Sequence, residues 1–296
     1  EILNAAHNLI SYNRNRKEKV LIPAVDIGER ITIYSATDEK VEANYVAKEI
    51  KRRQGREMRS YNDFAILFRI NAQSRLFEEA LSRWNVPYSM VKGLKFYERG
   101  EVRGLISALK SVYNSSDSES FLISITALFG LTEKTTRKFI FGAKISEKRI
   151  EKYKKHGGKV AKRMFESIKD FGSCIQELRK SSSSIAPLKV LNIVLESSGY
   201  LKKLKERETE VSRQKLENIE EFLSVAEEFS KGKGGNLGDF LTHLSFMQSL
   251  DLTEGEGGVT LMTAHSSKGI EFPVVFMVQM LEGLFPHIKS LSSAEE

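Results

Sequence analysis

The segment from Val259 to His287 reads VTLMTAHSSKGIEFPVVFMVQMLEGLFPH, and it decides the fold class. Its two apolar runs, Val259 to Met262 and Pro273 to Val278, have the length and the Val, Met and Phe content of buried strands. Such runs are typical of a covered, parallel sheet. Polar residues lie between them, at the kind of edge where α/β sheets bind ligands.

The loop between the two runs, Thr263 to Gly269, carries hydroxyls, an imidazole and an ammonium group. The residues alone leave two interpretations open. One is a phosphate-binding loop. The other is an ordinary connection from a strand to a helix, in which Ser266 or Ser267 caps the helix and Lys268 is solvated.

The α/β pattern recurs near the other end of the chain. Arg30 to Ser35 alternates as a strand, Asp63 to Arg69 is a strand of buried type, and Pro87 to Val91 is a short strand. Between them, Asp38 to Arg52 and Ser74 to Trp84 carry apolar residues at helical spacing. This alternation predicts a parallel sheet with helices on its faces.

From about residue 95 to residue 255 the apolar period is helical, and no strand is predicted. Helices are expected at Val102 to Val112, Phe121 to Leu128, Thr135 to Phe141, Val160 to Phe171, Leu188 to Glu196 and Leu216 to Phe229, with another near Ile2 to Ile10. The prediction is an α/β lobe of residues 1–94 and 256–296, interrupted by an all-α domain of residues 95–255. Polar, Gly- and Ser-rich crossings would let the two domains swivel.

Composition narrows the class of protein. The chain has 296 residues, of which 41% are hydrophobic and 29% charged, as in globular proteins. It has no apolar stretch of the roughly 18 residues that span a bilayer and no signal-peptide pattern, so we expect a cytoplasmic protein with no membrane partner. The single cysteine, Cys174, and five scattered histidines predict no metal site.

Charge is segregated along the chain. The net charge is +7, and the stretch from Lys134 to Arg163 holds twelve Lys or Arg against two Glu. The stretch from Glu206 to Glu228 holds eight Glu against three Lys or Arg. This distribution favours a basic patch that binds nucleic acid, with a solvated helical face as the alternative.

A second polar edge follows the strand of buried type. Ile66 to Leu81 reads ILFRINAQSRLFEEAL, which places Arg69 at a strand end and Asn71 shortly after it. A guanidinium there can hold a phosphodiester by forked hydrogen bonds. The alternative is a helix cap beside surface arginines.

Three segments together resemble the superfamily 1 DNA helicases of the UvrD, PcrA and Rep type. They are Ile66 to Leu81, Val91 to Val102 (VKGLKFYERGEV) and Val259 to His287, and they occur in the family's order. The last resembles motif V, followed by the element LFPH at Leu284 to His287. The resemblance covers the whole chain, because the helical insertion also lies where the family has its mobile accessory domain.

In that family two RecA-like lobes, of the P-loop NTPase type, clamp ATP and move along single-stranded DNA. The resemblance implies that this chain is the second lobe (2A) with its inserted domain (2B). It implies DNA contacts by Arg69, Asn71, Thr263, His265, Lys268 and His287, and ATP contacts by Glu271 and Gly269. A second interpretation of Glu271 is an acid at the start of a helix.

The segment from Phe129 to Phe139, FGLTEKTTRKF, is similar to the duplex-binding hairpin motif of the accessory domain. Thr132 stands where the family has a second glycine, which puts the close approach of backbone amides in doubt. Thr132 can instead cap a helix, while Lys134, Arg137 and Lys138 supply positive charge. The alternative is an ordinary helix-turn-helix joint.

The sequence has no G-x-x-x-x-G-K-[ST] phosphate loop and no strand that ends in paired Asp-Glu. The family's first lobe, which would bind most of the ATP and Mg²⁺, is missing. Its Asn-Tyr-Arg-Ser block is expected before Glu1, and its arginine-bearing motif VI after Glu296. We therefore expect no ATP hydrolysis by this chain alone.

The resemblance implies a fragment of an ATP-dependent 3′-to-5′ DNA helicase of repair or replication. Its expected partners are single-stranded DNA, the junction of single and double strands, the first lobe of the parent chain, and repair or replication proteins. Two alternatives stay open at this point. One is a non-catalytic interaction or DNA-binding module with a vestigial motif V, and the other is a related helicase-nuclease subunit.

Overall fold

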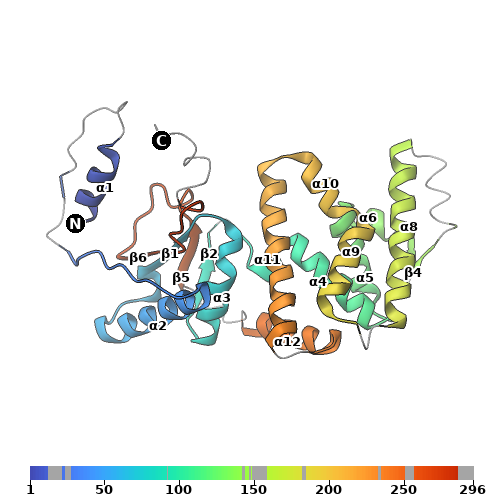
Figure 1. Ribbon diagram of the computed structural model, residues 1–296, viewed down its shortest axis with the longest axis horizontal. Coiled ribbons are helices and arrows are strands. Elements are labelled where there is room, and N and C mark those ends of the chain that lie inside the picture. Colours follow the sequence, from blue (N-terminus) through green and yellow to red (C-terminus); the bar gives the residue numbers. More distant parts are fainter. Residues whose placement is uncertain are drawn as a thin grey trace.

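The structure is a computed structural model of the 296-residue chain. It describes residues 1–12, 22–23, 28–91, 93–141, 144–146, 148, 159–181, 185–232, 235–250 and 257–285. Two units lie side by side along the long axis of the molecule, an α/β unit and a helical unit (Figure 1). In the described part of the chain, no helix is long and apolar enough to cross a membrane.

The α/β unit is built on a four-stranded sheet in the order β2-β5-β1-β6. Its strands are β1 (Phe64–Phe68), β2 (Tyr88–Met90), β5 (Val259–Thr263) and β6 (Val274–Met277), and all neighbouring pairs are parallel. The predicted parallel sheet is therefore confirmed. Strands from both ends of the sequence alternate in it, so the chain leaves the sheet after β2 and returns to its middle at β5.

Two helices pack on one face of this sheet. Helix α2 (Glu39–Glu57) begins at Asp38, whose carboxylate accepts a hydrogen bond from the amide of Val41 at 2.9 Å. Helix α3 (Ser74–Arg83) follows the short 3-10 turn η2 (Asn71–Gln73). Their apolar faces and alternate residues of β1 and β5 form one buried core, with Phe64, Ile66, Phe68, Phe77, Leu81, Val259 and Leu261 among its members.

The helical unit contains η3 (Phe96–Glu98), α4 (Gly100–Tyr113), α5 (Ser118–Phe129), α6 (Glu133–Thr136), α8 (Lys159–Lys180), α9 (Pro187–Ser198), α10 (Tyr200–Arg207), α11 (Glu210–Gly232) and α12 (Leu237–Leu250). Helices α4 and α5 pack closely, because a Cβ on Gly104 would lie 2.6 Å from the Cβ of Ala127. The core of this unit runs from Phe96 to Leu244 and shares no residue with the core of the α/β unit.

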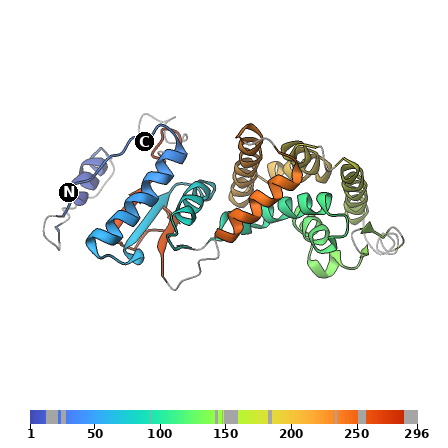
Figure 2. The same ribbon diagram turned by 90° about the horizontal axis from the view of Figure 1, so that it is seen from below.

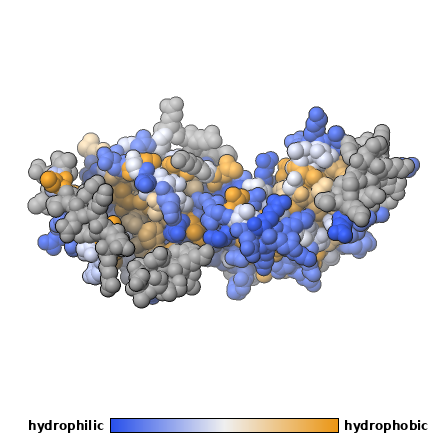
Figure 3. All heavy atoms as spheres, turned by 90° about the horizontal axis from the view of Figure 1, so that it is seen from above, coloured by the Kyte–Doolittle hydropathy of each residue, from blue (hydrophilic) through white to orange (hydrophobic). Residues whose placement is uncertain are grey.

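Helices α11 and α12 of the helical unit lie nearest to the α/β unit, as Figures 1 and 2 both show. The residues of η2 contact α11, and those of α3 contact α12. Seen from above, hydrophilic residues dominate the middle of the molecule, where the two units meet (Figure 3). The junction between the units is therefore polar rather than an extension of either core.

Several predicted elements differ in the structure. Arg30 to Ser35 forms no strand and pairs with no described strand, so the predicted strand there is wrong. The predicted helix from Thr135 to Phe141 is also wrong. Helix α6 ends at Thr136, and the chain then enters the small antiparallel pair β3 (Ile140–Phe141) and β4 (Lys144–Ile145). The helical unit thus contains one short hairpin, and it also has α10 and α12, which were not predicted.

Helix α1 (Ile2–Ile10) forms where its spacing predicts, but none of its residues is buried. Three of its large apolar residues, Ile2, Leu9 and Ile10, are exposed. The helix is therefore explained by local periodicity and not by packing within the described part of the chain.

Candidate nucleic-acid interface

The carboxyl ends of β1 and β5 meet at one edge of the sheet. The two strands are parallel neighbours, and Phe68 is in register with Thr263. The amide of Ala264 donates to the carbonyl oxygen of Phe68 at 2.8 Å, which holds the start of the second loop against the end of β1. The two polar edges predicted separately from the sequence are thus one site in space.

Arg69 and His265 are in direct contact at this edge. Arg69 Nη1 lies 3.0 Å from His265 Nδ1 and 3.4 Å from Nε2. A guanidinium can only donate, so the ring nitrogen that accepts from it carries no proton. His265 is exposed and Arg69 is partly exposed, so both remain accessible to a ligand.

Gln73 holds the backbone that carries Arg69. Its Oε1 accepts from the amide of Arg69 at 2.9 Å and from the amide of Ile70 at 2.8 Å. Its side chain is nearly buried, and its Nε2 has no hydrogen-bond partner within the described residues. The sequence did not indicate this role of Gln73, because a single polar side chain in a loop belongs to no periodic pattern that would mark it.

The loop after β5 is a series of turns. Thr263 Oγ1 and Ser266 Oγ lie 3.0 Å apart, and the amide of Ser266 donates to the carbonyl of Thr263 at 2.9 Å. Gly269 has φ +84°, a left-handed conformation that favours glycine. No helix begins here, so the interpretation in which Ser266 or Ser267 caps a helix is wrong.

Lys268 is exposed on this loop, next to Gly269. Asn71 is the first residue of η2, two residues after Arg69, and is partly exposed. His287 lies outside the described residues. The structure therefore places five of the six predicted DNA contacts at the ends of β1 and β5 or in the segments that follow, and these ends meet at one edge of the sheet. The five are Arg69, Asn71, Thr263, His265 and Lys268.

The predicted nucleotide contacts, Gly269 and Glu271, lie between the same loop and β6. Glu271 is exposed and does not start a helix, so the alternative of an acid facing a helix dipole is wrong. A free carboxylate fits a sugar hydroxyl, because it accepts hydrogen bonds. Within the described residues no group of three His, Cys, Asp or Glu could hold a metal ion.

Sequence comparison decides the family of this chain. Residues 1–296 match the UvrD-like helicase C-terminal domain. The chain belongs to this family. Its parallel sheet is consistent with the family's RecA-like lobe, and the chain is similar to part of the superfamily 1 helicases of the UvrD and PcrA type.

Relatives agree with this assignment. The chain is 36% identical over 311 residues to the ATP-dependent DNA helicase PcrA of Staphylococcus aureus strain Mu50. The aligned region covers 100% of this chain and 41% of the relative. It is also 36% identical over 314 residues to PcrA of Staphylococcus epidermidis strain RP62A, with the same coverage of 100% and 41%. The chain thus spans 41% of the length of these curated relatives.

The second predicted site of this UvrD-like chain lies between α5 and α6. Gly130 ends α5 with φ +66°, and Thr132 caps α6 by accepting from the amide of Thr135 at 3.3 Å. The predicted capping role of Thr132 is confirmed. Arg137 is paired with Glu133 at 2.7 Å and with Glu119 at 3.2 Å, so its charge is already compensated.

Lys134 and Lys138 are exposed in the same segment. Most of the basic stretch from Lys134 to Arg163 lies outside the described residues. Of the four residues predicted to contact duplex here, Thr132 is engaged in a cap and Arg137 in ion pairs. Lys134, Arg137 and Lys138 are all exposed, so all three present charge at the surface.

An acidic helix of the UvrD-like chain, α11, lies beside the sheet edge that carries Arg69. Glu217 of α11 is half-buried, and burial raises the pKa of its carboxyl, with further increases from Glu210 and Glu220. Arg213 and Arg69 act in the opposite sense and lower this pKa. The charge of Arg69 therefore reaches the helical unit, a link that no sequence pattern indicated.

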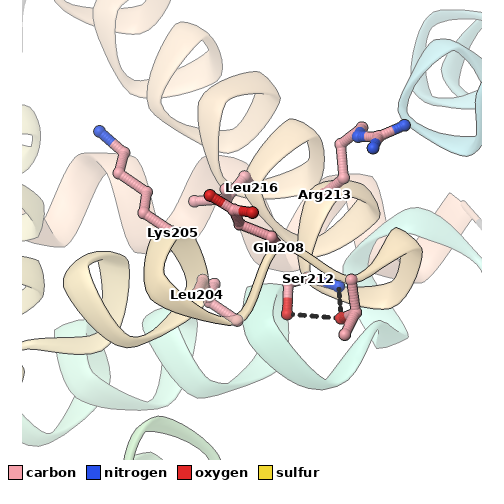
Figure 4. A pocket seen from close by; sticks show the side chains of 7 residues that line it. Leu204, Lys205, Glu208, Ser212, Arg213 and Leu216 are labelled. Atoms are coloured by element: carbon pink, nitrogen blue, oxygen red, sulfur yellow. Dashed lines mark hydrogen bonds between the residues drawn. The ribbon is translucent and has the colours of Figure 1, made fainter.

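A shallow pocket of about 290 Å³ lies between α10 and α11, away from this edge. Figure 4 shows Lys205 and Arg213 extending from opposite sides of it and away from each other. Its hydroxyls bond to one another, since Thr209 Oγ1 donates to Ser212 Oγ at 2.9 Å. The amide of Ser212 also donates to Thr209 Oγ1, so these groups cap the start of α11.

Proposed function

We propose that this chain is the second motor lobe, with its inserted accessory domain, of an ATP-dependent DNA helicase. The observation that carries the proposal is the contact between Arg69 and His265, which joins two family motifs at one sheet edge. The PcrA relatives are named ATP-dependent DNA helicases, which supports the same activity for the parent of this chain.

The proposed motor lobe consists of residues 1–94 and 256–296, and the inserted domain of residues 95–255. Two separate buried cores support this division, one in each unit. Residues 92 and 251–256 at the crossings are outside the described part. The described ends of the crossings, Val91 and Gly257, both lie close to the sheet, where Val91 donates to the carbonyl of Leu261.

We name the sheet edge formed by the residues after β1 and β5 the strand-binding edge, for the DNA strand it is proposed to bind. There Arg69 and Lys268 would hold phosphates of single-stranded DNA by charge. Thr263, Asn71 and His265 would add neutral hydrogen bonds to the same backbone. Such contacts grip the strand without reading its sequence, because every nucleotide offers the same phosphate. His287 is proposed as a further contact from the family resemblance alone.

ATP and Mg²⁺ are proposed as cofactors of the parent protein, where they supply the driving free energy of movement. In this chain Glu271 would accept a hydrogen bond from the nucleotide sugar, and Gly269 would allow a close backbone approach. The sequence contains no phosphate loop, so the phosphates would be held by another part of the parent. We therefore propose that the chain alone does not hydrolyse ATP.

In the inserted domain, Lys134 and Lys138 are proposed to contact duplex DNA beside the turn at Gly130. Arg137 is proposed to contact duplex there as well, because its ion pairs are exposed, and Thr132 would support the turn by capping α6. Movement from 3′ to 5′, a role in repair or replication, partner proteins from those processes and a cytoplasmic location are proposed from the family alone.

Fluorescence anisotropy with a labelled oligothymidylate tests the DNA-binding part of this proposal. At two salt concentrations, the chain should bind with a dissociation constant that rises steeply with salt, since each phosphate contact releases counterions. Absence of binding, or binding indifferent to salt, contradicts it. In the same samples, ATP hydrolysis stimulated by DNA above a no-protein control would contradict the proposed inactivity of the chain alone.

A further inference from the structure

A cluster of charged and polar side chains is buried where the two units meet, and the proposed DNA contacts do not use it. Arg75, Glu78 and Glu79 come from α3, Arg99 precedes α4, Glu101 is in α4, and Asn218 is in α11. Each of these residues is less than 9% exposed. Buried charge is costly unless it is paired, so this cluster requires an explanation.

Arg75 makes the first link between the units. Its Nε donates to Glu221 of α11 at 2.5 Å, and its Nη1 donates to Glu79 at 3.0 Å. Tyr97 donates to the same Glu79 oxygen at 2.8 Å. Burial lowers the pKa of Arg75, but the carboxylates of Glu79 and Glu221 outweigh it and hold the pKa above its ordinary value.

Arg99 makes the second link. Its Nη1 donates to Asn218 of α11 at 2.8 Å, and its Nη2 donates to Ser74 at the start of α3 at 2.7 Å. Asn218 in turn donates through Nδ2 to Glu101 at 2.6 Å. Asn218 thus uses both ends of its amide within the helical unit, where it fixes Arg99 against α11, and Arg99 carries the link across to Ser74 of α3.

These contacts carry the junction, because the two hydrophobic cores do not merge across it. The ion pair of Lys40 with Glu228 also joins the units, but its side chains are 57% and 42% exposed. An exposed pair of this kind contributes little. The buried links are directional, since each guanidinium has a fixed donor geometry, so they favour one orientation over others.

We propose that four residues position the helical unit relative to the strand-binding edge. They are Arg75, Arg99, Asn218 and Glu221, named here the polar junction. Turning the helical unit away would leave Arg75 without Glu221 and Arg99 without Ser74, and both arginines are nearly fully buried here. The polar junction therefore holds the orientation seen here, although the crossings between the units leave room for rotation.

The consequence for DNA rests on the proposed function. Helix α3 begins directly after the loop of Arg69, Asn71 and Gln73, and α11 contacts that loop. Glu217 lies on α11 one turn before Glu221, which binds Arg75. A release of the polar junction would therefore move an acidic helix away from the strand-binding edge.

Distances between two spin labels test the proposal without DNA. Labels go on Arg56→Cys in α2 and Lys189→Cys in α9, both exposed, in a Cys174→Ser background that removes the single native cysteine. The parent chain should give one narrow distance distribution. Glu221→Ala combined with Asn218→Ala should broaden it or add a second population, whereas Glu220→Ala, an exposed neighbour on α11, should leave it unchanged.

Circular dichroism melting checks that each variant is folded. If the double variant does not fold, the milder Glu221→Gln, which keeps an acceptor for Arg75, replaces it and should give a smaller broadening. Superimposable distributions for the parent chain and every folded junction variant overturn the proposal. Because no DNA is present, a chain that fails to bind DNA but broadens as described overturns the proposed function and not the polar junction.

Discussion

Arg69 Nη1 lies 3.0 Å from His265 Nδ1, although the two residues are 196 positions apart in the sequence. Parallel pairing of β1 with β5 makes this contact possible, because it brings the ends of both strands to one edge. In the proposed function, a guanidinium and an imidazole held together in this way act as one binding element for a phosphate.

The first prediction concerns this pair. Arg69→Gln should weaken binding to single-stranded DNA by about tenfold, because a charge-assisted hydrogen bond to phosphate is lost. His265→Ala should weaken it as well. The double variant should lose less than the product of the two effects, since the residues act together. Anisotropy titrations measure all three, with Lys202→Gln on α10 as a control that removes the same charge elsewhere. Fully independent effects would contradict a shared element.

The second prediction concerns Gln73. Gln73→Leu removes the acceptor of two backbone amides and should lower the free energy of unfolding by about 1–3 kcal/mol. It should also weaken DNA binding, since Arg69 loses its backbone support. Gln73→Glu keeps an acceptor oxygen and should retain more affinity. Urea unfolding and anisotropy measure the two quantities, and equal affinity of both variants would count against a positioning role.

The third prediction concerns the cap of α6. Thr132→Ala should lower the free energy of unfolding by about 1 kcal/mol, because the capping acceptor for the amide of Thr135 is lost. Thr132→Ser keeps a hydroxyl and should be nearly neutral. Thermal melting of both variants provides the comparison. A loss of the same size in Thr132→Ser would show that the methyl group, and not the cap, matters.

The fourth prediction concerns Glu217, whose pKa burial raises above the ordinary value of 4.5. The folded chain therefore binds this proton more tightly than the unfolded chain, and stability falls as pH rises from 4.5 through the raised pKa. Glu217→Gln should raise the free energy of unfolding at pH 7 by about 0.5 kcal/mol or less, because the group is half-exposed. The gain should vanish well below pH 4.5, where the carboxyl is protonated in both states. Urea unfolding at two pH values measures it.

The same substitution should also strengthen DNA binding at pH 7, because it removes a negative charge that acts on Arg69. Glu220→Gln, on an exposed position of the same helix, is the matched control. If both variants change affinity equally, a general field effect explains the result and the specific link between Glu217 and Arg69 is wrong.

The parallel sheet was predictable from sequence because its strands are apolar runs bounded by polar residues. The strand predicted at Arg30 to Ser35 was wrong for a physical reason. An alternating pattern of apolar and polar residues is compatible with a strand, but a strand also needs a neighbouring strand to pair with. Ile33 in this segment is 92% exposed. Tyr34 instead stacks on Tyr45 of α2, with ring centroids 3.6 Å apart.

The candidate site was predicted in parts and not as a whole. Arg69 and His265 were each expected at a strand end, but only the order of strands in the sheet brings them into contact. The supporting groups could not be predicted. Gln73 acts through a side chain folded onto its own backbone, and Glu217 reaches Arg69 only through the docking of α11.

The salt dependence of DNA binding by the parent chain, Lys268→Gln and Lys202→Gln tests the central claim most directly. If Lys268 contacts a phosphate at the strand-binding edge, its loss should reduce the slope of log affinity against log salt by about 0.7, the value for one contact with a single strand. Lys202→Gln should leave that slope unchanged. Equal slopes for all three proteins would contradict the assignment of this edge as the DNA-binding site.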